Sequence, residues 1–341
     1  MKPRILVIYT GGTIGMIKDP VSGQLSNVDF NLIYDHVPEL KRLHVELDTM
    51  SLAEPIDSSE IRPENWIDIA EMIQSNYESY NGFVVLHGSD TMAYTASALS
   101  FMFDGLKKPI ILTGSQLPIG VIRTDGKENL ITAIEIAATS EKGGEALIQE
   151  VAVYFDYQLF RGNRSTKYSA ENFEAFKSPN YDVLCNAGVE IKYNYAKLYR
   201  SKSDKLSLNI KFNYKVVNLK LFPGINFELY SELFNREKVD GILIESFGAG
   251  NTPSSKILRD LLSKFIKNGG VVLNLTQCSS GSVRQGLYKT SSLFNELGVI
   301  SGADMTTEAA IAKLMISLAT EKDQLSVNEI LSSDIRGELS I

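Results

Sequence analysis

The sequence has few of the residues that build metal sites and disulfide frameworks. Its 341 residues include two cysteines, Cys185 and Cys278, and three histidines. Two cysteines cannot form a disulfide framework in a chain of this length, and with only three histidines the composition does not favour a Cys/His zinc site. We therefore expect neither kind of site.

Long apolar runs are also missing. No segment approaches the ~18 apolar residues that a membrane-spanning helix requires. The apolar run in the N-terminal stretch MKPRILVIYTGG is too short for the core of a signal peptide. A formal net charge of −7 argues against a nucleic-acid-binding surface. These absences predict a cytoplasmic protein with no membrane or nucleic-acid partner.

What the sequence does contain is an alternation of short apolar runs with helical patterns, which is typical of parallel α/β proteins. The length suggests two domains. The predicted strands are 4–9, 83–87, 110–113 and 151–155, then 216–222, 241–247 and 271–277. The predicted helices are one with Pro63 in its first turn, a largely apolar and therefore buried one at 91–103, and others at 128–138, 254–266 and 307–319. The spacing of SVNE (326–329) predicts a capping box that opens a short last helix.

Basic and aromatic residues interleave in segment 191–215. This composition is compatible with a nucleic-acid-binding strip, but the acidic net charge favours a solvated connection between domains. We therefore predict an N-terminal domain at 1–190, a connection at 191–215 and a C-terminal domain at 216–341.

The stretch YTGGTIG, which follows the first predicted strand, is either a phosphate-binding loop or a turn that exposes a nucleophile. Its glycines at 11, 12 and 15 do not fit G-x-G-x-x-G, and no Gly-Lys-Ser/Thr ending is present. Two adjacent glycines do allow a tight turn beside a small hydroxyl residue. The pattern therefore favours Thr13 as an exposed nucleophile.

Two further segments place reactive side chains near strand ends. Ser89 and Asp90 follow the strand at 83–87, where they could cap the next helix or take part in catalysis. Arg161, Arg164 and Lys167 lie in QLFRGNRSTKYS (158–169), which is either a solvated basic loop or part of a site. A lysine buried beside Ser89 could lose its proton and act as a base. Ser89, Asp90 and Lys167 beside Thr13 would form an acyl-transfer site.

These segments together resemble the bacterial type I, cytoplasmic L-asparaginases. The resemblance extends from the first strand to RGEL (336–339) and so covers essentially the whole chain. TGGTI alone is moderately specific, and together with HGSDTMAYT it is highly specific. The motifs are YTGGTIG, DSSE (57–60), LHGSDTMAYTASALSF (86–101), ILTGSQLP (111–118), RGNRSTK (161–167), FGAGN (247–251) and NLTQCSSG (274–281).

The resemblance implies an N-terminal flavodoxin-like parallel-sheet domain and a smaller C-terminal α/β domain. It implies a homotetramer, a dimer of dimers, that hydrolyses L-asparagine to L-aspartate and ammonia through a threonine-bound intermediate. It implies no metal and no organic cofactor. Minor turnover of glutamine stays open.

The family's catalytic residues are carried over by motif. Thr13 matches the nucleophilic threonine. Ser89 stands where the family usually has a second catalytic threonine, and Asp90 and Lys167 match the acid and the lysine grouped with it. Because serine lacks the methyl group that restricts a threonine rotamer, we expect activity with looser positioning.

The resemblance also implies the substrate-binding residues. Asp57, Ser58 and Ser59 match the segment that holds the α-carboxylate of the substrate. Ser115 matches the position whose backbone carbonyl faces the amide nitrogen. Asn251 looks like the asparagine that enters the site from a neighbouring subunit.

The sequence departs from the family in the loop after Thr13 and in a regulatory region. The family loop carries a tyrosine, whereas loop 16–30 here has none before Tyr34 and has Gln24 near the expected place.

Some members bind asparagine at a second site, and Thr166, Thr276 and Cys278 match residues near it. Glu245 replaces the arginine expected there, so we predict that this regulation is absent or altered. We expect Cys278 to be a small buried residue and His87 to be a structural histidine.

Three other functions are compatible with parts of the pattern. A transfer-RNA amidotransferase subunit would carry a further domain before the threonine motif, and here that motif starts at Thr10. An amino-acid-binding sensor would not need Lys167. A nucleotide-binding protein fits worst, because the glycine spacing is wrong.

Overall fold

The computed structural model describes residues 2–18, 25–27, 37–286, 292–321 and 323–340. The chain divides into two compact units, Met1–Asn209 and Ile210–Ile341. Within the described ranges, no helix combines the length and apolar character needed to cross a membrane.

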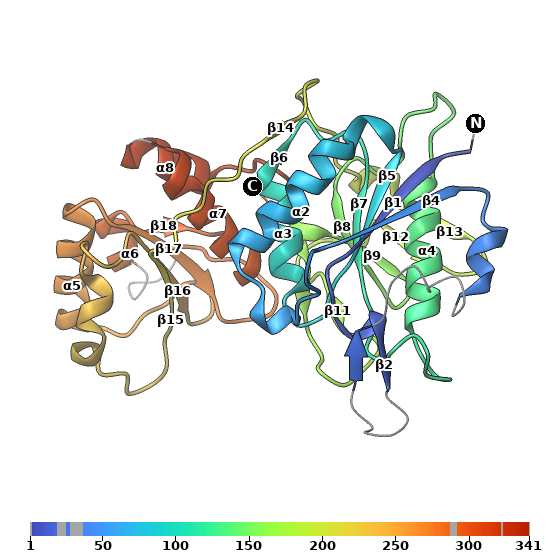
Figure 1. The fold of residues 1–341 in the computed structure, drawn as a ribbon. Coiled ribbons are helices and arrows are strands. Elements are labelled where there is room, and N and C mark those ends of the chain that lie inside the picture. Colours follow the sequence, from blue (N-terminus) through green and yellow to red (C-terminus); the bar gives the residue numbers. More distant parts are fainter. Residues whose placement is uncertain (1, 19–24, 28–36, 287–291, 322, 341) are drawn as a thin grey trace. The chain divides into compact units, whose positions relative to one another are not determined.

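The N-terminal unit is built on one eight-stranded sheet in the order β13-β12-β9-β8-β7-β5-β1-β4 (Figure 1). Its parallel strands are β1 (Arg4–Tyr9), β4 (Glu46–Ser51), β5 (Gly82–Leu86), β7 (Ile110–Thr113) and β8 (Val151–Phe155). Antiparallel strands β9 (Gln158–Arg161), β12 (Cys185–Ala187) and β13 (Ile191–Tyr193) extend it. Taken in chain order, the parallel strands have the 2-1-3-4-5 arrangement of flavodoxin-like folds.

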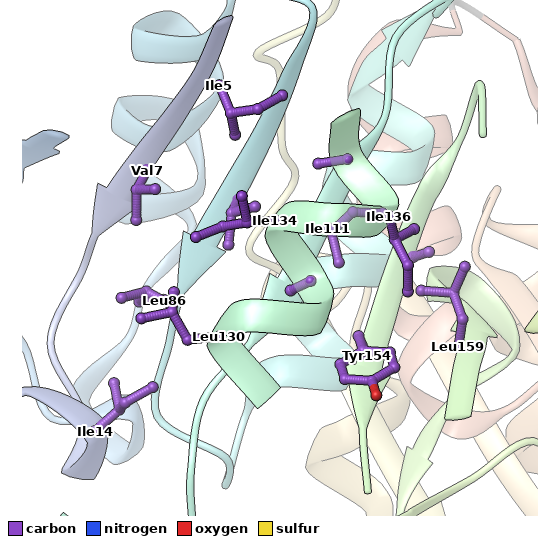
Figure 2. Packing of buried hydrophobic residues seen from close by; sticks show 14 of the residues in the cluster. Ile5, Val7, Ile14, Leu86, Ile111, Leu130, Ile134, Ile136, Tyr154 and Leu159 are labelled. Carbon is purple, nitrogen blue, oxygen red and sulfur yellow. The ribbon is translucent and has the colours of Figure 1, made fainter. Parts of the chain in front are cut away.

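Helices cover both faces of this sheet. Helix α4 (Gly126–Ala138) packs against β1, β5, β7 and β8, and Figure 2 shows Leu130 and Ile134 of α4 beside the sheet residues Ile5 and Leu86. Helices α2 (Pro63–Asn76) and α3 (Met92–Met102) lie on the other face (Figure 1). Every residue of α3 except Tyr94 is buried, which confirms the expectation of a buried helix.

The C-terminal unit has a smaller, fully parallel sheet in the order β15-β16-β17-β18. Its strands are β15 (Val216–Lys220), β16 (Gly241–Ser246), β17 (Val271–Thr276) and β18 (Ile300–Ser301). One face packs against the 3-10 helix η8 (Phe227–Phe234), α5 (Lys256–Lys267) and α6 (Ser292–Leu297). The other packs against α7 (Thr307–Thr320) and α8 (Gln324–Ser332). The predicted α/β class with a smaller second domain is confirmed.

Short elements account for the differences from the sequence prediction. Helix α8 begins at Gln324, because the Asp323 carboxylate accepts hydrogen bonds from the Ser326 N–H at 3.0 Å and hydroxyl at 2.9 Å. The prediction that SVNE opens this helix was therefore wrong. Within segment 191–215, residues Ile191–Tyr193 form β13, and Ser207–Leu208 form β14, which pairs with β6 (Phe103–Asp104).

Candidate active site

The candidate site lies where the strand order of the large sheet reverses. Strand β1 has β4 on one side and β5 on the other, so the connections that follow β1 and β5 diverge. Open α/β sheets bind ligands at this switch point, outside the carboxyl ends of the strands. The loops after β1 and β5 are the two segments in which the sequence predicts Thr13, Ser89 and Asp90.

Glycines bring the loops at this edge into close contact. Gly11 (φ 123°) and Gly12 (φ 87°) have backbone conformations that L side chains rarely adopt. A Cβ on Gly11 would lie 2.2 Å from the Ile56 carbonyl oxygen, and one on Gly12 would lie 2.5 Å from Gly88 Cα. A Cβ on Gly88 would lie 2.5 Å from Ser58 Oγ. The loop of Gly11 and Gly12 therefore packs backbone to backbone against the other two loops, whereas Gly88 packs against the Ser58 side chain.

Thr13 opens the short 3-10 turn η1 (Thr13–Gly15) and is half-buried. The next residue, Ile14, is fully buried in the same cluster as Leu86, which anchors the turn in the core (Figure 2). The backbone of Ile14 also accepts a hydrogen bond from Ile119 N–H at 3.3 Å. The backbone of the turn is thus fixed, and the Thr13 hydroxyl makes no hydrogen bond to any described residue.

Ser89, Asp90 and Lys167 form one hydrogen-bonded group. Lys167 Nζ donates to Ser89 Oγ at 2.9 Å and forms an ion pair with Asp90 Oδ1 at 2.5 Å. Neither Ser89 nor Asp90 caps α3, because the N-cap residue is Thr91, so the capping interpretation was wrong. The Thr91 hydroxyl donates to the Ser58 carbonyl at 2.6 Å and ties this loop to the 57–60 segment.

Lys167 lies on a short hairpin of β10 (Thr166–Lys167) and β11 (Phe176–Lys177). Its side chain is only 16% exposed. Arg161 and Arg164, which precede it, are also buried, and Arg161 Nε pairs with Glu150 Oε2 at 2.7 Å. The interpretation of this segment as a solvated basic loop was therefore wrong.

The segment Asp57–Ser59 is a short turn with a carboxylate at its start. Asp57 caps the 3-10 helix η4 (Ser58–Glu60) and accepts from the Ser59 N–H and hydroxyl, both at 2.9 Å. These hydrogen bonds hold the pKa of Asp57 below its usual value, and the bond from the Ser59 N–H has the larger effect. Partial burial opposes them. Ser58 is buried, while Asp57 and Ser59 are exposed.

The loop after β7 carries the predicted Ser115 and one residue that the sequence prediction missed, Gln116. Ser115 is buried, and its hydroxyl donates to the Leu117 carbonyl at 2.6 Å. Gln116 Oε1 accepts from Ser89 Oγ at 3.2 Å. The Gln116 N–H donates to the Asp125 carboxylate at 2.9 Å. The signal for Gln116 in the sequence is its place beside Ser115 in the motif ILTGSQLP (111–118).

His87 is a structural residue, as the sequence predicts. It is fully buried, with Nδ1 2.7 Å from the Gly88 carbonyl and Nε2 2.8 Å from Thr95 Oγ1. The Trp66 indole N–H donates to Thr95 Oγ1 at 3.0 Å. Burial lowers the pKa of His87 to about 4, and its bond to Gly88 only partly opposes this. The imidazole is therefore neutral near neutral pH and satisfied on both nitrogens.

In the C-terminal unit, the predicted residues lie near the carboxyl ends of β16 and β17. Asn251 closes a tight turn, with its N–H donating to the Phe247 carbonyl at 2.8 Å. Thr276 Oγ1 accepts from the Cys278 N–H at 3.1 Å. Cys278 is exposed because it lies in the turn after β17, so the expectation of a buried cysteine was wrong.

The Glu245 carboxylate is engaged within its own unit. Its Oε1 accepts from Asn218 Nδ2 at 2.7 Å and from Thr307 Oγ1 at 3.3 Å, and Oε2 lies 3.6 Å from Lys220 Nζ. Glu245 pairs with Leu275 and Thr276 with Ser246, so Glu245 and Thr276 point to opposite faces of the sheet. Thr166, the fourth predicted regulatory residue, lies on β10 of the N-terminal unit. Gln24 and Tyr34 lie outside the described residues.

Comparison with known proteins shows that both units of the chain are similar to one family. The model "Asparaginase, N-terminal" matches residues 4–199, and "Glutaminase/Asparaginase C-terminal domain" matches residues 215–331. L-asparaginase 1 of Escherichia coli (strain K12) is 40% identical over 344 residues, covering 99% of this chain and 98% of that protein. The crystal structure of L-asparaginase I from Vibrio cholerae O1 biovar eltor has a TM-score of 0.90 and 37% identity, with 100% of both chains covered. The thermostable L-asparaginase from Thermococcus kodakarensis has a TM-score of 0.90 and 30% identity, with 99% of both chains covered.

Proposed function

The chain belongs to the asparaginase family, and on this basis we propose that it hydrolyses the side-chain amide of L-asparagine with Thr13 as the nucleophile. The products are L-aspartate and ammonia.

In the first half of the reaction, Thr13 Oγ1 attacks the side-chain amide carbon and gives a tetrahedral oxyanion. Backbone N–H groups in the surrounding turns would stabilise this charge, which is a large term in acyl-transfer catalysis. The amide nitrogen takes up the proton that the Thr13 hydroxyl gives up, the carbon–nitrogen bond breaks, ammonia leaves, and a β-aspartyl ester remains on Thr13. The rigid glycine turn suits this step, because it presents the hydroxyl without moving.

In the second half, water hydrolyses the ester. Ser89 and Lys167 would position this water, which adds to the ester carbon while the bond to Thr13 Oγ1 breaks and the threonine regains its proton. The 2.9 Å contact between Lys167 Nζ and Ser89 Oγ supports a shared role for these two residues.

Residues around the reacting carbon would orient the substrate. The turn formed by Asp57, Ser58 and Ser59 would hold the α-carboxylate, and Asp90 would bind the α-ammonium group. Asp90 can do so because its side chain is 62% exposed despite the ion pair with Lys167. The Ser115 carbonyl would face the leaving amide nitrogen. Binding energy gathered away from the reacting carbon then supplies orientation.

Assembly and location complete the proposal. Asn251 would enter the site of a neighbouring subunit, which requires an oligomer, and we propose a homotetramer in the cytoplasm. Light scattering of the purified protein checks the tetramer, and Asn251→Ala should weaken asparagine binding without changing the mass of the assembly.

The observation that carries the proposed function is the Ser89–Asp90–Lys167 group at the edge where Gly12 packs on Gly88. The experiment is ammonia release from L-asparagine and L-glutamine by the wild-type protein, Thr13→Ala and Thr13→Ser. We expect release from asparagine that Thr13→Ala abolishes and Thr13→Ser partly keeps. The glutamine rate measures the breadth of the site. A folded wild-type protein that releases no ammonia from either substrate would instead support an amino-acid-binding sensor.

A further inference from the structure

Gln116 connects Ser89 to the hairpin that carries Lys167. Its side-chain carbonyl oxygen accepts from Ser89 Oγ at 3.2 Å, and its amide nitrogen donates to the Asn172 carbonyl at 3.0 Å. Asn172 lies in the turn between β10 and β11, and Lys167 is the last residue of β10. The Gln116 amide group therefore bonds both to Ser89 and to the hairpin that carries Lys167.

The chemistry of the donors fixes the direction of each hydrogen bond. A lysine ammonium can only donate, so Ser89 Oγ accepts from Lys167. The single proton of the Ser89 hydroxyl is then directed to Gln116 Oε1. Because the Asn172 carbonyl can only accept, it requires the amide nitrogen of Gln116 and leaves the oxygen facing Ser89. The hydroxyl is held from both sides, and one lone pair stays available to a water molecule.

The backbone under Gln116 is itself fixed. The Asp125 carboxylate accepts from the Gln116 N–H at 2.9 Å and from the Leu117 N–H at 3.1 Å. Asn129 Nδ2 donates to the same carboxylate at 3.2 Å. A side chain that starts from a rigid backbone can orient a catalytic group with little loss of freedom.

Serine at position 89 makes such a partner necessary. A serine hydroxyl lacks the methyl group that restricts the χ1 angle of threonine, so its orientation must come from its hydrogen bonds. We propose that Gln116 is a positioning residue for hydrolysis of the aspartyl ester: it sets the Ser89 hydroxyl and keeps the Lys167 hairpin against it. This inference rests on the proposed function, because the role of Ser89 is part of that proposal.

The test uses Gln116→Met, which keeps the length of the side chain and removes both polar atoms. We expect kcat for asparagine to fall about tenfold while KM changes less than about twofold, because the lost hydrogen bonds act on the reacting groups and not on bound substrate. Gln158→Met is the matched control. Gln158 lies on β9, where its side-chain amide donates to the neighbouring Asn186 side chain at 3.3 Å, and its substitution should leave kcat unchanged.

A second readout separates positioning from general support of the loop. If Gln116 acts on ester hydrolysis, the ester on Thr13 should accumulate in Gln116→Met. Mass spectrometry after an acid quench during turnover should then show a larger modified fraction than in the wild type. Ser89→Thr in the Gln116→Met background should restore at least about threefold in kcat, because threonine restricts its own rotamer.

The inference is overturned if Gln116→Met keeps the wild-type kcat, or if kcat falls with no extra ester and no rescue by Ser89→Thr. If Gln116→Met does not fold, Gln116→Glu replaces it: this variant keeps an acceptor for Ser89 and loses only the donor to Asn172. We then expect a smaller loss of kcat with the same accumulation of ester, and unchanged ester levels would overturn the inference. The proposed function fails on a different result, namely a wild type without ammonia release or an active Thr13→Ala.

Discussion

The two units of the chain both contain a parallel sheet, but the order of the strands differs. In the N-terminal unit β1 lies between β4 and β5, so the order reverses at β1. In the C-terminal unit β15, β16, β17 and β18 follow one another without reversal. A reversal sends neighbouring connections to opposite faces and leaves the strand ends open to a ligand, whereas a consecutive order does not.

The carboxyl edges of the two sheets nonetheless carry similar residues. Lys167 pairs with Asp90 in the N-terminal unit, and Lys220 lies 3.6 Å from Glu245 in the C-terminal unit. Among the described residues, only the first pair contacts a serine hydroxyl, and it lies beside the glycine turn that carries Thr13. A lysine–carboxylate pair therefore becomes a candidate site through its place in the topology and the hydroxyl groups beside it.

The largest loss of activity should come from replacing Lys167, and Lys220 offers a matched comparison. Lys167→Met should lower kcat for asparagine by about 10²- to 10⁴-fold, the range typical of a lost acid–base group. Lys220→Met is the matched variant, and it should keep the wild-type rate because Lys220 is mostly exposed. Ammonia release measures both. Equal losses of kcat in the two variants would contradict the inference that only Lys167 belongs to the site.

The next effect concerns stability. The C-terminal unit buries an ion pair between Lys313 and Glu338 at 2.5 Å. Lys313→Met would leave the Glu338 carboxylate buried without its partner, and we expect unfolding to become easier by about 3–5 kcal/mol. Urea unfolding followed by circular dichroism measures the loss, with Lys264→Met on the exposed side of α5 as the control.

Trp66 makes this measurement specific to one unit. It is the only tryptophan in the chain and lies in the N-terminal unit, so its fluorescence reports that unit alone. The fluorescence transition of Lys313→Met should shift less than the circular dichroism transition. A loss below about 1 kcal/mol in circular dichroism would contradict the expected cost of an unpaired buried charge.

The third prediction is that the stabilities of the two units depend differently on pH. The pKa of His87 falls from 6.5 to about 4 on burial, so between these values the unfolded chain binds a proton that the folded chain does not. The stabilisation is complete above pH 6.5 and is lost as pH falls toward 4. The N-terminal unit should therefore lose about 3 kcal/mol across this window.

The stability contributed by Glu338 in the C-terminal unit should be lost only at lower pH. Burial alone would raise the pKa of Glu338, but the Lys313 ammonium and nearby backbone N–H groups outweigh burial and place it below its usual 4.5. The stability from Glu338 is present above pH 4.5 and disappears only as the pH falls further. Trp66 fluorescence in urea at a series of pH values follows the first unit, and His87→Asn should flatten its slope between pH 6.5 and 4. His44→Asn, at an exposed position, should leave the slope as it is.

The smallest expected effect is the absence of regulation by substrate. Glu245 presents a carboxylate already engaged by Asn218 and Thr307, and a second carboxylate would be repelled there. The rate should rise hyperbolically with asparagine concentration, and Glu245→Gln should leave the shape of the curve unchanged. Strong sigmoidality in the wild type would contradict this prediction.

Local patterns predicted the elements that are buried and long. Strands such as β1, β7 and β8 are continuous apolar runs, and their predicted bounds are those of the structure. Strand β4 escaped prediction because its sequence, ELDTMS, is polar and only partly buried at the edge of the sheet. Strands β12 and β13 have three residues each, too few for a periodic signal.

Much of the candidate site came from motifs, and the rest depends on contacts that local sequence does not encode. Ser89 and Lys167 are 78 residues apart, and their hydrogen bond follows from the way β10 folds back. Gln116 is 56 residues from Asn172. No spacing rule connects such positions, so Gln116 and Asp125 could be found only in the structure.

The close packing of Gly11, Gly12 and Gly88 also has a consequence for how this site can diverge. Gly11 and Gly12 cannot accept a side chain without separating the loops, because a Cβ at either would meet backbone atoms, so this part of the site resists stepwise evolution and redesign. A change of substrate must instead arise at the rim, where Ser59 and Asn172 are exposed. A mutational library aimed at new amide substrates should therefore leave the glycines fixed and vary the rim.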